Sequence, residues 1–409
     1  MQPANASVRY HALDSLRGVM MLLGIYLHAI CAYSNFPDVW WYKDARTSAF
    51  FDFNLLFIHI WRLPVFFVMA GFFAALLNER RGTGGFALNR AKRVLAPFAL
   101  GLAVLWPLLQ GLRRYTKVWS EPDALWTAVG YVFRGTYWKW LDPTHLWFLE
   151  VLLVLYVLAL SFLPLARRID ETFLSGWIHR AFRAAVRSSW RPVVFAFPTF
   201  GTLCLMNLGV LDTLHSFAPA PHVVLAYGVF FGFGWLLYVH ADLLPSFRKH
   251  AWKQIVAALL LGWPNFWFLL RQVQARPAVD ALGFYGTAAT GALAVWLMIF
   301  GCTGLFLRYL DRPIPRMRYL SDSSYWLYLF HPPVVFWSQV LVAGFAWPAW
   351  GKAVASLAIS VPLLLASYHF LVRPTWIGAL LNGRRHPRKT VTGYAITDLP
   401  ATRICPQPE

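Results

Sequence analysis

The sequence has little charge, and especially little acid, for its length. Asp and Glu number 18 among 409 residues and charged residues reach only 13%, whereas 58% of the chain is hydrophobic. A soluble domain of this size needs a more polar surface than this composition supplies. The scarcity of charge therefore excludes a soluble enzyme and predicts an all-α, polytopic membrane protein.

Cysteine is also scarce, and its spacing is unlike that of a metal site. The four Cys, at positions 31, 204, 302 and 405, are widely scattered, and three of them lie in apolar runs. We interpret them as packing residues and expect no bound metal. The chain shows no internal repeat and no cleavable signal pattern, so we predict one membrane domain over residues 1–385 and a basic, disordered tail over 386–409.

Apolar runs of spanning length are abundant. Ten are expected, over residues 15–34, 54–77, 94–112, 145–165, 192–211, 222–240, 254–270, 284–307, 321–343 and 352–372. With a cytoplasmic N-terminus, 26 of the 37 Lys and Arg fall on the inner side and 10 on the outer side. This bias predicts that both termini are cytoplasmic. It also accounts for the net charge of +19 without a nucleic-acid partner. The basic stretch 166–191 fits an amphipathic helix on the lipid bilayer.

The first apolar run carries a cation at one end and a base well inside it. Arg17 and His28 are eleven residues apart, so a helix returns them to nearly the same face and separates them by roughly 16 Å. Ionisable groups at membrane depth are costly and are therefore functional candidates. One face of this helix thus offers a cytoplasmic cation and a deep base.

Two further arginines lie near the cytoplasmic end of the third run. Arg90 and Arg93 are spaced i, i+3 and face the same way, as binding of a phosphate requires. Taken alone, each is better explained as a positive-inside anchor. Together with Arg17 they predict a cytoplasmic anion site, which would suit a phosphorylated carrier such as coenzyme A.

The second run carries His59 and Arg62 on one helix face. A buried guanidinium needs a partner, for which Asp52, Glu150 or a substrate would serve. His59 could instead be a structural residue that is hydrogen-bonded within the bundle. The pair therefore predicts either an acceptor site or support for one.

Two more histidines lie at the ends of other runs. His145 and Trp147 begin the fourth run, where Trp147 could also be an interfacial anchor. His331 precedes Pro332 and Pro333, a pair that should kink or break its helix. A purely structural alternative for His331 is to bond the carbonyls that the prolines free.

Sorted by depth, these groups describe a path from a donor to an acceptor. A donor held by its phosphates at the three arginines could send a flexible arm toward His28, and coenzyme A thioesters have such an arm. An imidazole that titrates near neutrality is suited to take the proton from an attacking hydroxyl. An acyl-histidine intermediate is the alternative.

Five of these segments resemble one family of membrane enzymes. They are Arg17-x10-His28, the run 65–73, Arg90-x-x-Arg93, the run 145–149, and the run 328–332. In this order and at these depths they resemble the acyltransferase-3 superfamily of membrane O-acyltransferases, over residues 13–373. The similarity is greatest to a branch associated with succinylation of osmoregulated periplasmic glucans.

The resemblance implies a multi-pass enzyme of the bacterial inner membrane. Its donor would be cytoplasmic acyl-CoA, succinyl-CoA or acetyl-CoA, and its acceptor the hydroxyls of a periplasmic glucan. His28 becomes the catalytic candidate by this resemblance, and Arg17, Arg90 and Arg93 become the donor-binding candidates. The candidates for acceptor binding or support are His59, Arg62, His145, Trp147, Glu150 and His331.

Two other functions remain open at this point. An O-acetyltransferase that acts on another cell-envelope glycan would need the same residues. A proton-coupled transporter belongs to a different class, but buried His and Arg beside broken helices also describe such carriers. Many transporters contain an inverted repeat, and none is visible in this sequence.

Overall fold

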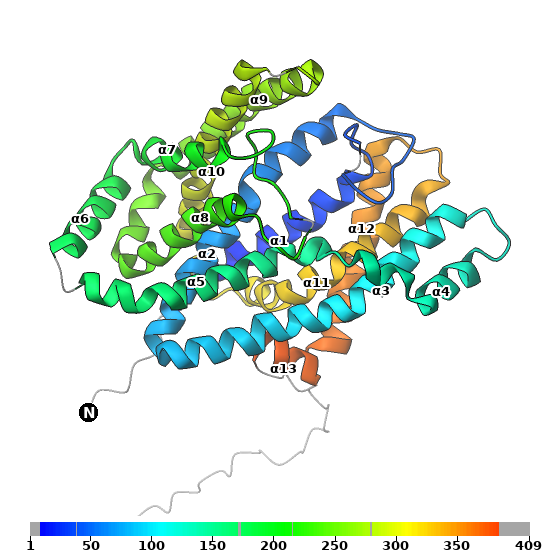
Figure 1. Ribbon diagram of the computed structural model, residues 1–409, viewed down its shortest axis with the longest axis horizontal. Coiled ribbons are helices and arrows are strands. Elements are labelled where there is room, and N and C mark those ends of the chain that lie inside the picture. The colour runs from blue at the N-terminus through cyan, green and yellow to red at the C-terminus, as the bar shows by residue number, and fades with distance from the viewer. Residues whose placement is uncertain (1–8, 38, 171–172, 215, 279, 384–409) are drawn as a thin grey trace, which may run out of the picture.

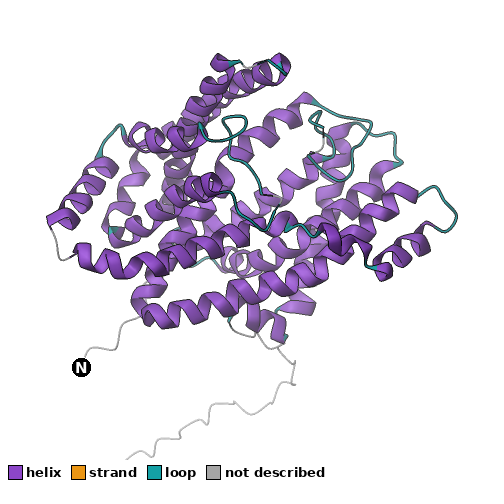
Figure 2. Ribbon diagram, viewed as in Figure 1, coloured by secondary structure: helices purple, strands orange, loops and turns teal. Residues whose placement is uncertain are grey.

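The computed structural model describes residues 9–37, 39–170, 173–214, 216–278 and 280–383, and within these residues it contains helices and no strand (Figure 2). The all-α prediction is confirmed for this part of the chain. The elements are α1 (His11–Cys31), α2 (Ala49–Arg90), η1 (Ala91–Leu95), α3 (Ala96–Val118), α4 (Ala124–Arg134), η2 (Thr136–Trp140), η3 (Thr144–Leu146), α5 (Trp147–Asp170), α6 (Phe173–Arg187), α7 (Arg191–Leu203), α8 (Pro221–Val239), η4 (Ala241–His250), α9 (Ala251–Ala275), α10 (Ala281–Tyr309), α11 (Pro315–Ala343), α12 (Ala349–Ser367), η5 (Tyr368–Val372) and α13 (Trp376–Asn382).

Eight segments of the described chain are long and apolar enough to cross a membrane. One of them, Ala49–Val118, contains the two runs expected at 54–77 and 94–112, and Gly82 interrupts its helical geometry with a φ of 69°. The run expected at 192–211 corresponds to α7, whose 13 residues are fewer than the about 20 that a crossing needs. The chain is thus a multi-pass membrane protein. The count of ten spans and the cytoplasmic termini remain predictions, and the tail 386–409 lies outside the described residues.

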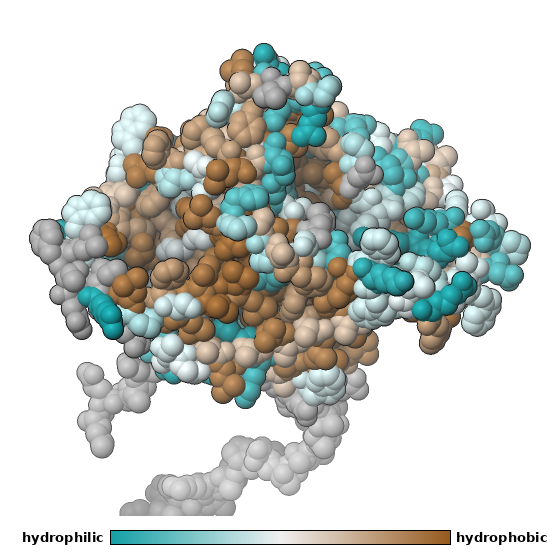
Figure 3. Space-filling model, in the orientation of Figure 1, coloured by the Kyte–Doolittle hydropathy of each residue, from teal (hydrophilic) through white to brown (hydrophobic). Residues whose placement is uncertain are grey.

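Helix α1 lies within the bundle, packed against α2, α10, α11 and α12 (Figure 1). Large apolar side chains on the periphery are exposed, among them Phe133 (86%) and Phe197 (80%). Apolar residues also cover the middle of the face shown in Figure 3. Such exposure fits contact with lipid rather than water, because a soluble protein of this size would not leave so much apolar surface exposed.

The predicted amphipathic stretch at 166–191 is divided between the end of α5 and α6. Trp177 of α6 is exposed, whereas Phe182 and Val186 are buried. The Phe182 ring packs against Phe195 and Phe233, with ring centroids 6.0 and 5.6 Å away. Part of the apolar face of α6 therefore packs against the protein itself, which the sequence pattern did not reveal.

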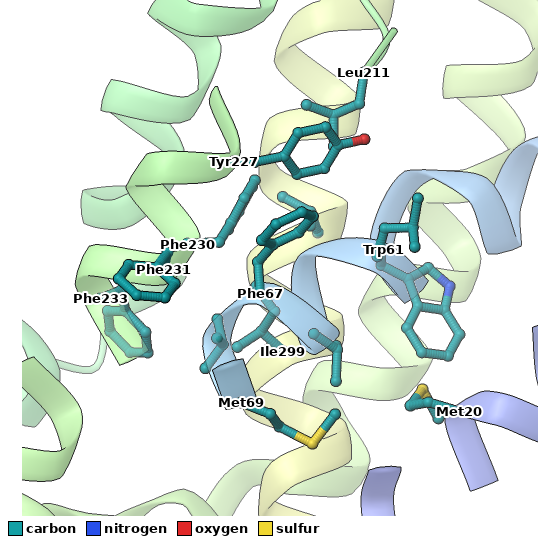
Figure 4. Packing of buried hydrophobic residues seen from close by; sticks show 14 of the residues in the cluster. Met20, Trp61, Phe67, Met69, Leu211, Tyr227, Phe230, Phe231, Phe233 and Ile299 are labelled. Atoms are coloured by element: carbon teal, nitrogen blue, oxygen red, sulfur yellow. The ribbon is translucent and has the colours of Figure 1, made fainter. Parts of the chain in front are cut away.

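Helices α2 and α8 approach so closely that their backbones touch. A Cβ placed on Gly71 of α2 would overlap the carbonyl oxygen of Phe231, and one on Gly234 of α8 would overlap that of Val68. Small residues permit this approach in membrane bundles. Beside this contact, Phe67 stacks on Tyr227 with ring centroids 4.5 Å apart (Figure 4).

Helix α11 continues through Pro332 and Pro333 as one helix; of the expected kink or break, the break is therefore wrong. The two prolines lack the N–H groups that would bond the carbonyls of Tyr328 and Leu329. Histidine side chains take these carbonyls instead: His331 Nδ1 lies 2.8 Å from the oxygen of Tyr328. His331 thus has the contact expected of its structural alternative, a hydrogen bond to a carbonyl that the prolines free.

The carbonyl oxygen of Leu329 is bonded by another element. His145 Nε2, on η3, lies 3.0 Å from it, and the hydroxyl of Tyr328 donates in return to the carbonyl of His145 at 2.7 Å. These reciprocal bonds tie η3 to α11. They also explain why the helix persists, because both freed carbonyls have donors.

We expect Gly71→Ala to destabilise the protein by about 1–3 kcal/mol, because the added methyl group must separate α2 from α8. Gly232→Ala is the matched control. Gly232 lies on α8, but a Cβ placed on it would have no atom within 4 Å. Thermal unfolding of the detergent-solubilised variants measures both. Equal melting temperatures for the two variants would contradict the close contact.

His145→Ala should cost about 1–3 kcal/mol of unfolding free energy, because it leaves the buried Leu329 carbonyl without a donor. In a Pro333→Ala background residue 333 regains an N–H for that carbonyl, so removal of His145 should cost much less. Pro332→Ala frees a different carbonyl and should leave the full cost in place. A double-mutant cycle of unfolding free energies measures this coupling, and simple additivity in the Pro333→Ala background would refute it.

Candidate active site

One cavity of about 420 Å³ connects most of the predicted site residues. Among the residues that line it are Arg17, Arg90, Arg93, His28, His59, Arg62, His145, Trp147 and His331. Glu150 is the one predicted site residue that does not line it. The helices α1, α2, α5 and α11, together with η1 and η3, bring these side chains together from positions more than 300 residues apart in sequence.

Three imidazoles gather at one end of the cavity. The ring of His331 lies between the other two, with its centroid 4.9 Å from that of His28 and 5.7 Å from that of His145. In the described part of the chain no three His, Cys, Asp or Glu side chains form a group that could hold a metal ion. Because imidazoles can both accept and donate protons, three of them this close are suited to proton transfer.

The hydrogen bonds of His331 fix which of its nitrogens can act as a base. Nδ1 lies 2.9 and 2.8 Å from the carbonyl oxygens of Leu327 and Tyr328, and because carbonyls only accept, Nδ1 carries the proton. Nε2 then has the lone pair, and it is buried with no hydrogen-bond partner. Nδ1 of His28 is likewise buried and unpartnered. Two neighbouring imidazoles thus keep a free ring nitrogen.

His145 differs from these two because both of its nitrogens are occupied. Nε2 donates to the Leu329 carbonyl at 3.0 Å, which leaves Nδ1 to accept from the hydroxyl of Thr144 at 3.2 Å. With no nitrogen left for a substrate, His145 supports the architecture of the site. The residue also lines the cavity.

Two residues that the sequence analysis did not single out hold the turn that carries His28. The side-chain amide of Gln339 on α11 donates to the carbonyls of His28 and Ala29 at 3.0 and 3.1 Å. Its oxygen accepts from the indole N–H of Trp40 at 2.7 Å, and the Trp40 ring lies 4.9 Å from the His28 ring. Gln339 is fully buried. Its position two turns after His331 on one helix face was the only sequence signal.

Three guanidinium groups line the other end of the cavity. Arg17 donates to Ser321 Oγ at 2.7 Å and lies 3.6 Å from Asp14. Arg90 donates to the hydroxyl of Tyr156 at 3.2 Å and lies over its ring. Arg93 makes no hydrogen bond within the described chain. Because these three cations share one cavity wall, this end favours an anion.

The candidates His59, Trp147 and Glu150 have different surroundings. His59 Nε2 bonds the carbonyl of Leu211 at 3.0 Å, which matches its structural alternative, although the residue also lines the cavity. Trp147 is buried against Tyr227 rather than located at the surface, so it is not an interfacial anchor. Glu150 is buried, and its Oε2 has no hydrogen-bond partner.

Comparison with known proteins identifies the family of the chain. The acyltransferase domain family, acyltransferase-3, matches residues 10–369. Proteins named glucans biosynthesis protein C from Salmonella paratyphi B and Salmonella enteritidis are each 26% identical to this chain, over 80% of its length and 82% of theirs. No solved structure matches. Because the family covers most of the sequence and of the described helices, the chain belongs to the acyltransferase-3 family and is a membrane acyltransferase.

Proposed function

We propose that this protein transfers an acyl group, specifically succinyl, from cytoplasmic acyl-CoA to hydroxyl groups of a periplasmic glucan, in the bacterial inner membrane. The observation that carries the proposal is the single cavity that joins the three arginines to the three imidazoles. A donor and an acceptor that approach from opposite sides of a membrane need such a connection. The names of the Salmonella relatives support a glucan as the acceptor.

The length of the cavity suits a thioester on a flexible arm. Helix α1 is continuous from His11 to Cys31, so Arg17 and His28 are separated by roughly 16 Å along its axis. Phosphates bound at Arg17, Arg90 and Arg93 would leave the pantetheine arm of the donor to reach the imidazoles. Ser321 and Tyr156 already orient two of these guanidinium groups, which reduces the entropy lost when phosphate binds.

His28 acts as the general base in this proposal. It takes the proton from the acceptor hydroxyl as the hydroxyl oxygen attacks the thioester carbonyl, the C–S bond breaks, and the coenzyme A thiolate leaves. Gln339 and Trp40 hold the backbone and the ring of His28 in place. His331, which also lines the cavity and whose Nε2 has no hydrogen-bond partner, supports the charge that develops on the neighbouring imidazole.

His28→Ala should lower turnover by roughly 100-fold or more, since general-base catalysis contributes about that factor, while binding of acyl-CoA is retained. The measurement is thiol release from succinyl-CoA by the purified, lipid-reconstituted protein, with and without periplasmic glucan. Release at the wild-type rate by the variant would exclude His28 as the base. Release that does not depend on any acceptor would count against glycan acylation.

Replacement of both Arg90 and Arg93 by Ala should weaken acyl-CoA binding by roughly 10-fold or more, because contacts between guanidinium and phosphate are charge-assisted. Lys92→Ala is the matched control: Lys92 lies between them in sequence and is exposed, but does not line the cavity. Isothermal titration with a nonhydrolysable acyl-CoA analogue gives both affinities. If the double variant binds acyl-CoA as tightly as the control, these arginines act as positive-inside anchors and do not bind the donor.

A further inference from the structure

Arg62 is a buried cation without a counter-ion in the described part of the chain. The residue is 9% exposed, it lines the cavity, and its Nε is buried without a hydrogen-bond partner. The sequence offered two carboxylates as partners, and neither forms the pair. Asp52 is held instead by Asn35, whose backbone N–H and side-chain amide donate to it at 2.5 and 2.7 Å. Glu150 lies outside the cavity lining.

The fold makes room for this guanidinium beside α1. A Cβ on Gly24 would overlap Nη1 of Arg62, so the cation rests against the helix only because residue 24 is a glycine. Gly24 precedes His28 by four residues, about one turn, or roughly 6 Å along the axis. An anion bound to Arg62 would therefore lie within one helical turn of the proposed base.

An anion at this location differs from the phosphates of the donor. Arg17 is seven residues from Gly24, which places the phosphate end roughly 10 Å away along α1. The oxyanion of a tetrahedral intermediate is transient and would leave the buried cation unpaired during most of the cycle. A carboxylate on the acyl group is permanent, and a planar guanidinium matches it with two parallel hydrogen bonds.

We propose that Arg62 binds the free carboxylate of a dicarboxylic acyl group and thereby selects a succinyl-type donor over neutral acyl donors. This inference rests on the proposed function. In a succinyl thioester the carboxylate carbon is three C–C bonds from the reacting carbonyl, about 4 Å at ~1.5 Å per bond. That length is comparable to the one-turn offset between Gly24 and His28. Arg62 is thus a specificity-determining residue.

The test compares two donors that differ at one end. Succinyl-CoA and butyryl-CoA have four-carbon acyl groups of similar length, one ending in a carboxylate and the other in a methyl group. In the reconstituted full-length protein, Arg62→Gln should lower kcat/KM for succinyl-CoA roughly 10- to 100-fold, mainly through KM, because the lost hydrogen bonds involve charged groups. The value for butyryl-CoA should stay constant or rise.

Two further variants separate specificity from damage to the fold. Gly24→Ala keeps Arg62 but displaces its guanidinium, so it should lose the preference for succinyl-CoA in the same way. Arg113→Gln removes a different, half-buried cation, one that stacks on Trp41 at 4.4 Å and does not line the cavity, and it should keep the preference. Melting temperatures confirm that each variant is folded.

The outcomes distinguish this proposal from the proposed function. Equal losses for both donors in Arg62→Gln would mean that Arg62 acts on the shared transition state, and unchanged values would mean that it contacts no donor carboxylate; either result overturns the inference. Titration of the two donors provides a readout that does not need turnover. Tighter binding of succinyl-CoA that disappears in Arg62→Gln supports the subsite even if thiol release fails. If neither donor binds to the wild-type protein, both proposals fall.

Discussion

Hydrocarbon offers no hydrogen bonds, so each polar group in a membrane-spanning helix must find its partner within the protein. This constraint shapes the centre of the molecule at Pro332 and Pro333. The carbonyls that they free are taken by His331 and His145, which keeps α11 continuous and fixes η3 against it. The same bond holds the proton on Nδ1 of His331, so that its second nitrogen keeps the lone pair. A structural requirement and a chemical one are thus met by a single side chain.

The polar groups that the protein leaves unsatisfied are informative for the same reason. Nε of Arg62, Nδ1 of His28 and Nε2 of His331 are buried without partners, and all three residues line one cavity. Lys352, by contrast, is a buried cation that is paired with Asp44 at 2.7 Å. A buried unpaired charge costs several kcal/mol. A protein that retains such groups at one place gains when a ligand supplies the missing partners.

The sequence was sufficient to predict the all-α fold and to single out the ionisable residues that meet in the cavity, because an ionisable residue in an apolar run is conspicuous. It was insufficient where the partner is distant along the chain. The hydrogen bond between Gln339 and His28 joins residues 311 positions apart. The hydrogen bond from His145 to the Leu329 carbonyl, which a proline left without its helical donor, joins residues 184 positions apart. Local rules therefore predicted a kink or a break at Pro332 and Pro333, and the break is prevented by hydrogen bonds from side chains that those rules do not include. Glu150 does not line the cavity, because helical phase alone does not decide which helix face meets it.

A donor with charge at both ends can be held at both ends. The arginines at one end of the cavity would bind its phosphates and Arg62 its acyl carboxylate, which leaves the thioester carbonyl between two fixed points and close to His28. Fixing a reacting group in this way converts binding energy into orientation. A neutral acyl chain would bind through the phosphates alone and leave Arg62 buried and unpaired. Selectivity for the acyl group and positioning of the carbonyl would then arise from the same ion pair.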